Sequence, residues 1–337
     1  MRMTGKFILV FIVGCWPGHD STCAQDIAAS YQLIEDRFYI EWIGQVSPDD
    51  VRKKKTLIDK IGGFIWGSEP ALMNRPVAVL AMNPDQMWIL DQNSQTIIEY
   101  RDGKEHQPQS LKRNHESFPS LVDLTVIPEG NILFTDSYRN QVFCISPQGD
   151  ACHPLNPFLT LEQPTGIAYS KVTNEIWVTE TGAHCITVLT PDGHRVRSIG
   201  KRGTEPGEFN FPTYISIDER GDIYVVDAMN FRIQIFNSKG EYLNDFGEIG
   251  QATGYFASPK GIATDHYGNI YVVDALFHSV QVFDREGALL SYFGTQGQEK
   301  EHFWLPTGIY IDDMDRIYVA DGYNSRVQIF KIKPMAK

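Results

Sequence analysis

One sequence pattern recurs six times along this chain of 337 residues. Each copy has a short apolar run that ends in an acid, then a polar turn and a second apolar run, as in DIYVVDAMNFRIQIF at Asp222–Phe236. Successive acids are 45, 44, 47, 47 and 47 residues apart, and they are Asp91, Asp136, Glu180, Asp227, Asp274 and Asp321. Six copies at one period predict a single repeat architecture.

Each repeat also contains signals for four short strands. A proline stands 15 to 17 residues before each acid, at Pro76, Pro119, Pro164, Pro212, Pro259 and Pro306. Proline lacks an amide donor, so it suits the first residue of a strand. Turns that contain glycine separate the later strands. Four strands in up-and-down order, arranged radially, predict the blade of an all-β propeller with six four-stranded antiparallel blades.

The two ends of the repeat region predict how the ring closes. The repeats span 76–334, and the last one stops after its third strand, which leaves an exposed edge. An unpaired strand pattern lies far upstream, at Arg37–Ser47. We expect this strand to complete the last blade, so that the propeller spans 37–334. A helix start at Ser47-Pro48 predicts a helix at about 48–66 that leads to the first blade.

The N-terminal residues have the layout of an export signal. In 1–24, Arg2 and Lys6 accompany the apolar run Phe7–Val13, which is too short to span a bilayer. Two cleavage sites fit: a lipobox that makes Cys15 a lipidated N-terminus, or a small-residue site that ends at Ala24. Both predict export, to the periplasm or to a lipid anchor on the outer membrane. Residues 25–36 then form a tether.

Export permits disulfide bonds, and Cys144 and Cys152 flank the turn SPQGD. Opposed strand residues have Cβ atoms close enough to bridge, so one interpretation is a disulfide across this hairpin. The other interpretation is a pair of small apolar core residues, because the repeat register aligns these cysteines with Ile235 and Leu243. Cys185 has no evident partner.

The later repeats resemble the NHL repeat over about 37–333. The resemblance rests on the segments SIGKRGTEPGEFNFPTYI, DFGEIGQATGYFASPKGI and YFGTQGQEKEHFWLPTGI within 198–309. The signatures of WD40 and kelch propellers are missing. The first three repeats depart from the pattern at Glu180, Cys185 and Pro119. The whole layout is similar to exported bacterial six-bladed NHL proteins, some of which are encoded beside multihaem cytochromes; the resemblance makes a cytochrome partner conceivable.

The repeated acids are interpreted as structural. Asp227 and Asp321 are each followed five residues later by an arginine, Arg232 and Arg326. An acid at the end of a strand can accept hydrogen bonds from turn amides and pair with this arginine. An active site is needed once, whereas these acids recur in every blade. We expect exposed pairs, worth about 0–1 kcal/mol, that order the turns.

Binding residues are expected where the repeats differ, on the face that carries the turn after the second strand. The fourth residue after each acid varies: Gln95, Asn140, His184, Phe231, His278 and Ser325. Its neighbours include Tyr138, Arg139, Met229, Phe277 and Tyr323. Lys260 and the polar residues Ser120, Thr165, Thr213 and Thr307 follow the opening prolines, nearer the central channel. Aromatic, Arg and His side chains suit a contact surface for a protein or a small ligand.

Neither a metal nor another cofactor is predicted. His184 and His278 are in register but belong to the third and fifth repeats, and zinc needs three or four ligands. Peptide-amidating lyases resemble NHL propellers and use His-bound zinc, but this chain offers only two of the histidines. Gluconolactonase-type propellers hold calcium with a Glu that RPVAVL at 75–80 lacks.

We therefore expect a non-catalytic exported scaffold, monomeric, whose loop face binds another protein of the cell envelope. The formal net charge of −12 argues against nucleic acid as a partner. Membrane contact is expected only through the lipid anchor. The alternatives are a metal-dependent lyase or lactonase and a receptor for a small ligand or carbohydrate.

Overall fold

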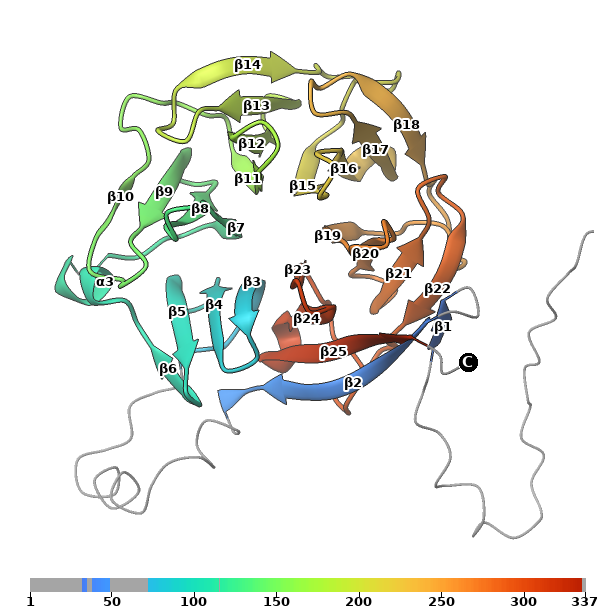
Figure 1. Ribbon diagram of the computed structural model, residues 1–337, viewed down its shortest axis with the longest axis horizontal. Coiled ribbons are helices and arrows are strands. Elements are labelled where there is room, and N and C mark those ends of the chain that lie inside the picture. Colours follow the sequence, from blue (N-terminus) through green and yellow to red (C-terminus); the bar gives the residue numbers. More distant parts are fainter. Residues whose placement is uncertain (1–31, 35–37, 49–71, 115, 335–337) are drawn as a thin grey trace, which may run out of the picture. The chain divides into compact units, whose positions relative to one another are not determined.

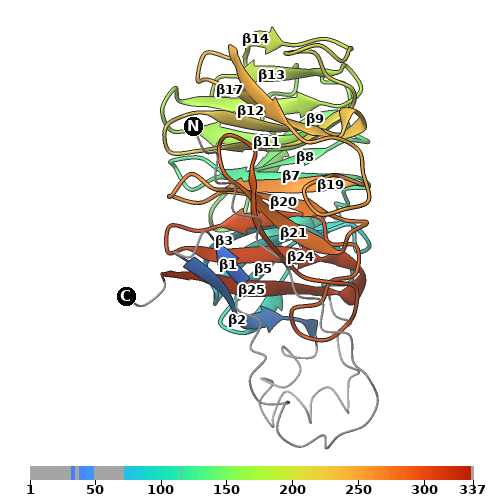
Figure 2. The same cartoon turned by 90° about the vertical axis from the view of Figure 1, so that its right-hand side faces the viewer.

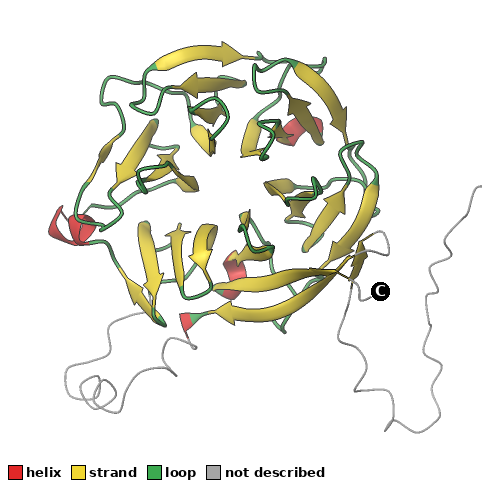
Figure 3. Cartoon of the chain, in the orientation of Figure 1, coloured by secondary structure: helices red, strands yellow, loops and turns green. Residues whose placement is uncertain are grey.

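A computed structural model describes residues 32–34, 38–48, 72–114 and 116–334, within a compact unit that spans Gln32–Lys337. These residues form six antiparallel sheets whose first strands surround a common centre (Figure 1). Nearly all the regular structure is strand (Figure 3). The predicted six-bladed propeller is confirmed. No helix in the described part of the chain is long and apolar enough to cross a membrane.

Each blade contains four strands in sequence order, except where the N-terminal strand joins the last blade. The first blade consists of β3 (Pro76–Asn83), β4 (Gln86–Asp91), β5 (Thr96–Arg101) and β6 (Lys104–His106). The second blade consists of β7 (Leu121–Val126), β8 (Ile132–Asp136), β9 (Gln141–Ile145) and β10 (Cys152–Pro154). The third blade consists of β11 (Pro164–Ser170), β12 (Glu175–Glu180), β13 (Cys185–Leu189) and β14 (Arg195–Ile199). The next two consist of β15 (Pro212–Ile217), β16 (Ile223–Asp227), β17 (Arg232–Phe236) and β18 (Tyr242–Phe246); and β19 (Pro259–Thr264), β20 (Ile270–Asp274), β21 (Ser279–Phe283) and β22 (Leu289–Phe293). The sixth has β23 (Ile309–Ile311), β24 (Arg316–Asp321), β25 (Arg326–Pro334) and β2 (Phe38–Val46), with the short β1 (Gln32–Ile34) beside β2.

The second and third strands of a blade are buried on both faces, because each sheet packs between two neighbouring sheets. All residues of β16 and β20 are buried, which explains their continuous apolar runs. One cluster joins Trp177 and Val188 of the third blade to Ile223 and Phe236 of the fourth. The fourth strands lie at the perimeter and are more exposed, as in β14. The core is therefore a set of layers between blades.

The opening proline pairs with the acid across the first two strands. Pro212 lies opposite Asp227, and Pro259 lies opposite Asp274. In the second blade Leu121 takes this position opposite Asp136, so Pro119 comes two residues earlier. This offset accounts for the longer spacing of 17 residues between Pro119 and Asp136 in the sequence.

Ring closure follows the prediction. The N-terminal strand β2 pairs antiparallel with β25, from Phe38 opposite Pro334 to Val46 opposite Val327. Figure 2 shows the two strands side by side. The indole nitrogen of Trp42 donates a hydrogen bond to Oε1 of Gln328 at 3.1 Å. The sixth blade thus takes its outer strand from the opposite end of the sequence.

The structure adds short elements that the sequence analysis did not predict, and two predicted segments lie outside the described residues. Residues Gln32–Ile34, within the predicted tether, form β1 along β2. The link between the first two blades contains an unpredicted helix, α3 (Gln109–Asn114), and two short 3-10 turns follow acids in the fourth and sixth blades (η1, Ala228–Asn230; η2, Gly322–Asn324). The predicted leader 1–24 with Cys15, and the predicted helix at about 48–66 beyond Pro48, lie outside the described residues.

The predicted disulfide between Cys144 and Cys152 is wrong. Cys144 pairs with His153, whereas Cys152 pairs with Ile145, so the hairpin register is shifted by one residue. Successive side chains of a strand point to opposite faces, and the two thiols therefore enter different core clusters. Both thiols are free, as is that of Cys185. The interpretation as small core residues accounts for the pair.

Candidate functional site

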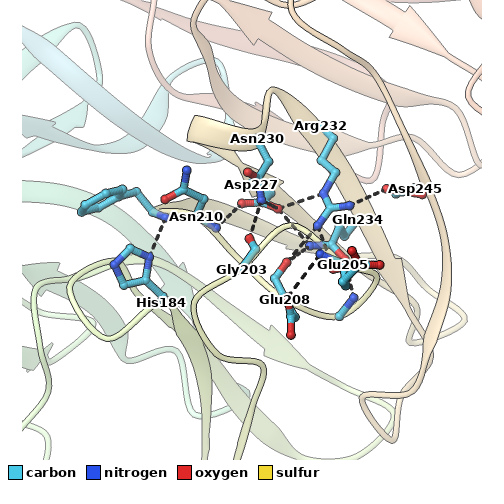
Figure 4. A network of polar contacts seen from close by, with 12 residues as sticks. His184, Gly203, Glu205, Glu208, Asn210, Asp227, Asn230, Arg232, Gln234 and Asp245 are labelled. Atoms are coloured by element: carbon cyan, nitrogen blue, oxygen red, sulfur yellow. Dashed lines mark hydrogen bonds and ion pairs between the residues drawn. The ribbon is translucent and has the colours of Figure 1, made fainter.

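The six repeated acids are completely buried or nearly so. Asp227 and Asp321 have the most extensive side-chain networks, and Figure 4 shows the surroundings of Asp227. Its Oδ1 accepts a hydrogen bond from the backbone amide of Asn210 at 2.7 Å. Its Oδ2 accepts from the side chains of Asn230 at 2.8 Å, Arg232 at 2.9 Å and Gln234 at 3.0 Å. One carboxylate thus ties the link before the blade to the turn and to the third strand.

The arginine partners are more deeply buried than the sequence indicated. Arg232 is 9% exposed and Arg326 is 6% exposed, so the expectation of exposed ion pairs is wrong. Arg232 also donates to the carbonyl oxygens of Glu205 and Glu208, and to Asp245 at 2.9 Å. Removing one partner of a buried and fully bonded pair costs far more than breaking a surface pair.

The second blade lacks part of this network. In the other five blades, a backbone amide 17 or 18 residues before the acid donates to its carboxylate, as Asn74, Glu162, Asn210, Ala257 and Trp304 do. Pro119 stands 17 residues before Asp136 and has no amide hydrogen. Gln141 stands where the fourth and sixth blades have an arginine. The buried Oδ2 of Asp136 and Oε1 of Gln141 consequently have no hydrogen-bond partner.

The variable fourth residue after each acid has a structural role. Its backbone is left-handed in all six blades, with φ between 52° and 57° at Gln95, Asn140, His184, Phe231, His278 and Ser325. Nδ1 of His184 accepts a hydrogen bond from the amide of Phe211 at 3.1 Å, and Nδ1 of His278 accepts from that of Leu305 at 3.0 Å. Both donors precede the next blade, so the two histidines fasten neighbouring blades together.

These contacts require a histidine with an unprotonated Nδ1. Burial lowers the pKa of His278, while the negative charges of Asp321 and Asp274 oppose that shift. His184 is buried and packs against the ring of Phe211, with the ring centres 4.4 Å apart. The structure therefore assigns both histidines to the frame of the propeller rather than to an open surface.

Four further predicted residues are only partly exposed. The guanidinium of Arg139 lies 4.8 Å from the ring centre of Phe118 and pairs with Glu116 at 3.2 Å. Phe231 packs against the core between the fourth and fifth blades, and Phe277 is half-buried. Burial lowers the pKa of Lys260, and the charge of Asp274 opposes this effect.

The second residue after the acid is exposed in every blade except the third, where Gly182 is partly buried. It is apolar in four blades, with exposed fractions of 76% at Tyr138, 56% at Met229, 59% at Leu276 and 51% at Tyr323. We call these four residues the turn-face residues. Nearby links add Phe211 and Trp304, both exposed, and Arg75 lies 4.7 Å from the ring centre of Tyr323. Aromatic and apolar side chains therefore gather on this face.

A cavity of about 180 Å³ lies where the first strands of all six blades meet. Each of these strands is at the inner end of its sheet, so backbone groups along its free edge face the centre. Asp123 of β7 is the only charged side chain among the described residues that line the cavity. Its Oδ1 accepts a hydrogen bond from the amide of Leu124 at 2.9 Å, and its Oδ2 accepts from that of Ile167 at 3.1 Å.

Burial raises the pKa of Asp123 to about 7, although both backbone hydrogen bonds oppose the shift. Burial also raises the pKa of Tyr214, and the charge of Asp123 adds to that shift. The charge of the Asp123 carboxylate therefore disfavours ionisation of the Tyr214 hydroxyl. A carboxyl group that changes its charge near neutrality is a candidate for binding or proton transfer.

The pKa of Asp123 predicts how its replacement changes stability with pH. Between its ordinary value of 3.8 and about 7, the folded protein holds a proton that the unfolded chain has lost. The stability that this proton provides is present below pH 3.8 and is lost as the pH rises through 7. We expect the unfolding free energy of Asp123→Asn, measured by denaturant titration, to rise relative to that of the wild type between pH 4 and pH 8, by on the order of 4 kcal/mol. A difference from wild type that does not vary with pH would contradict the assignment.

Sequence reasoning missed Leu276 and Asp123. Leu276 was detectable, because it shares the register of Tyr138, Met229 and Tyr323. Asp123 interrupts an apolar strand. Because Pro119 lies two residues before the position that pairs with Asp136, counting from the proline does not align Asp123 with the matching residues of the other blades. Among the described residues, no group of three or more His, Cys, Asp and Glu side chains is placed to hold a metal ion.

The repeats match a known family of sequence models. The NHL repeat model matches residues 161–189, 209–236 and 303–330, which lie in the third, fourth and sixth blades. These segments confirm the resemblance seen in the sequence. The match covers the second and third strands in each of these blades, and therefore the turn between them.

Several solved structures share the fold. Virginiamycin B lyase from Staphylococcus aureus is 16% identical, with a TM-score of 0.56, and the alignment covers 77% of this chain and 95% of the lyase. A gluconolactonase from Xanthomonas campestris is 15% identical, with a TM-score of 0.58 and coverage of 77% and 86%. An auxiliary nutrient binding protein from Bacteroides thetaiotaomicron is 12% identical, with a TM-score of 0.58 and coverage of 77% and 69%. At these identities the likeness is one of fold.

Proposed function

We propose that this six-bladed propeller of NHL repeats is a non-catalytic scaffold that binds another protein through its turn face. The observation that carries the proposal is the exposure of an apolar side chain at the same turn position in four blades: Tyr138, Met229, Leu276 and Tyr323. We also propose, from the leader predicted at 1–24, that the protein is exported and that its partner belongs to the cell envelope.

The chemistry of this face supports contact with a protein. Exposed apolar groups in one region commonly mark interaction sites, and aromatic residues with arginine are enriched in them. Tyr323 with Arg75, and Met229 with the neighbouring Phe211, provide such side chains on the turns and links. Buried acids beneath them hold the turn backbone, because the amides of Tyr138 and Leu276 donate hydrogen bonds to Asp136 and Asp274. The exposed side chains thus project from a rigid frame.

The test compares capture of partners from an envelope extract by immobilised wild-type protein and by a variant in which the four turn-face residues are serine. We expect the variant to lose about 2 kcal/mol or more of binding free energy, because truncation of interface anchors has this effect. A matched control replaces exposed apolar residues at the turns between the first and second strands of the blades, namely Met82, Val172 and Met314.

Three outcomes decide the proposal. Specific capture that is lost in the turn-face variant and retained in the control supports it. Capture that is retained by the turn-face variant contradicts it, as does a folded and abundant protein that captures nothing specific. Thermal unfolding of both variants ensures that each is compared in the folded state.

A further inference from the structure

One register position of the first strand separates the six blades into two classes. This position is Gly166, Gly261 and Gly308 in three blades and Ala78 in another. A Cβ added at Gly166 would lie 2.5 Å from the carbonyl oxygen of Thr213 in the next blade. The tight fit between inner strands explains the small residues. Asp123 and Tyr214 occupy the same position in the second and fourth blades, and both residues line the cavity.

We propose that the central cavity binds a small organic cation, with the carboxylate of Asp123 as its counter-ion and the ring of Tyr214 as an aromatic contact. This site lies away from the turn-face residues and does not depend on the proposed protein partner. A cavity with one carboxyl group and an aromatic residue on its wall matches the chemistry of an ammonium group.

The hydrogen bonds of Asp123 favour a cation over an anion or a neutral molecule. The amides of Leu124 and Ile167 hold both carboxylate oxygens in place without supplying a full positive charge. No basic side chain lines the cavity among the described residues, so the carboxylate has no counter-ion there. An ammonium group would restore the charge balance. Carbonyl oxygens on the free strand edges add acceptors for its N–H or polarised C–H groups.

The size of the cavity limits the ligand. A volume of about 180 Å³ is close to the roughly 150 Å³ of a protein cavity that binds benzene. A compact amine or quaternary ammonium ion fits this space.

Binding should release a proton near neutrality. A cation beside Asp123 favours its charged form, so it lowers a pKa that burial has raised to about 7. The other titratable side chains on the cavity wall are Tyr169, Tyr214 and Tyr310, and burial raises the pKa of each. They stay neutral between pH 6 and pH 8, so Asp123 alone accounts for the proton.

Isothermal titration calorimetry of the full chain with choline chloride tests the proposal. The matched control ligand is 3,3-dimethylbutan-1-ol, which has the same shape without the charge. We expect choline to bind about tenfold more tightly at pH 8 than at pH 6, and the alcohol to bind at least tenfold more weakly than choline at pH 8. Titrations in buffers of different ionisation enthalpy should show proton release.

Three variants assign the effect to residues. Asp123→Asn should lose at least tenfold in choline affinity and all of the pH dependence. Tyr214→Phe should retain binding, and Ser216→Phe should block the cavity while keeping the charge of Asp123. Thermal unfolding checks that each variant is folded.

Equal binding of choline and the alcohol would overturn the proposal, as would unchanged binding by Asp123→Asn or by Ser216→Phe. An absence of choline binding to the wild-type protein at pH 8 would also overturn it. Capture of a protein partner by the turn face stays unchanged in these variants, so the two proposals fail or succeed separately.

Discussion

Deletion of β2, Phe38–Val46, is expected to abolish cooperative folding of the propeller. Without it, the third strand of the sixth blade, β25, exposes eight paired positions as an open edge. The deletion also uncovers the apolar cluster between the fifth and sixth blades, to which Ile40 belongs. Size-exclusion chromatography and circular dichroism during heating should show an aggregating chain without a sharp unfolding transition.

Two point variants of β2 test its packing against the sixth blade without shortening the chain. Ile40 is buried against the sixth blade, whereas Ile43 on the same strand is exposed. Ile40→Asp should lower the free energy of unfolding by roughly 3 kcal/mol or more, because it buries a carboxylate without a partner. Ile43→Asp should change it by less than about 0.5 kcal/mol. A soluble deletion variant that unfolds cooperatively at the wild-type temperature would refute the closing role of β2.

The second large effect is expected at the buried acid of the fourth blade. Asp227→Asn removes the charge that faces Arg232 and replaces an acceptor oxygen with a donor nitrogen. Arg232 then keeps only the ion pair with the partly exposed Asp245, so we expect the free energy of unfolding to fall by about 3 kcal/mol. Chemical denaturation followed by tryptophan fluorescence measures the change.

The second blade supplies the control for this experiment. Asp136→Asn keeps the oxygen that accepts hydrogen bonds from the amides of Tyr138 and Arg139. The new amide nitrogen takes the place of Oδ2, which has no hydrogen-bond partner that the substitution could remove. We therefore expect a change of less than about 1 kcal/mol, with stabilisation as the favoured sign. Equal losses at Asp136 and Asp227 would show that the incomplete network of the second blade does not matter energetically.

Most of the fold was predictable because it repeats. The spacing of Asp227, Asp274 and Asp321 revealed the period, and the missing fourth strand of the last blade indicated a role for Arg37–Ser47. The hairpin of Cys144 and Cys152 was not predictable, because the position of residues around a turn does not determine the register of its strands. A shift of one residue moved the two thiols to opposite faces.

The candidate sites were harder to predict because variability was taken as a sign of binding. The repeat position of His184 and His278 has a different residue in most blades, yet each of these histidines accepts a hydrogen bond from the link that follows its blade. The exposure of Leu276 and the position of Asp123 at the central cavity depend on how the strands pack around the ring. Such packing brings together residues from six separate repeats, and no local pattern encodes it.

The pairing of β2 with β25 has a consequence for how the chain is made. The hydrogen bond between Trp42 and Gln328 joins residues 286 positions apart. A ribosome therefore releases β2 long before its partner strand, and the sixth blade stays open until β25 has emerged. Closing so long a loop costs conformational entropy, and contacts of this range slow folding. The nascent propeller spends its synthesis as an open arc, and truncated chains released early from the ribosome should be natural clients of chaperones.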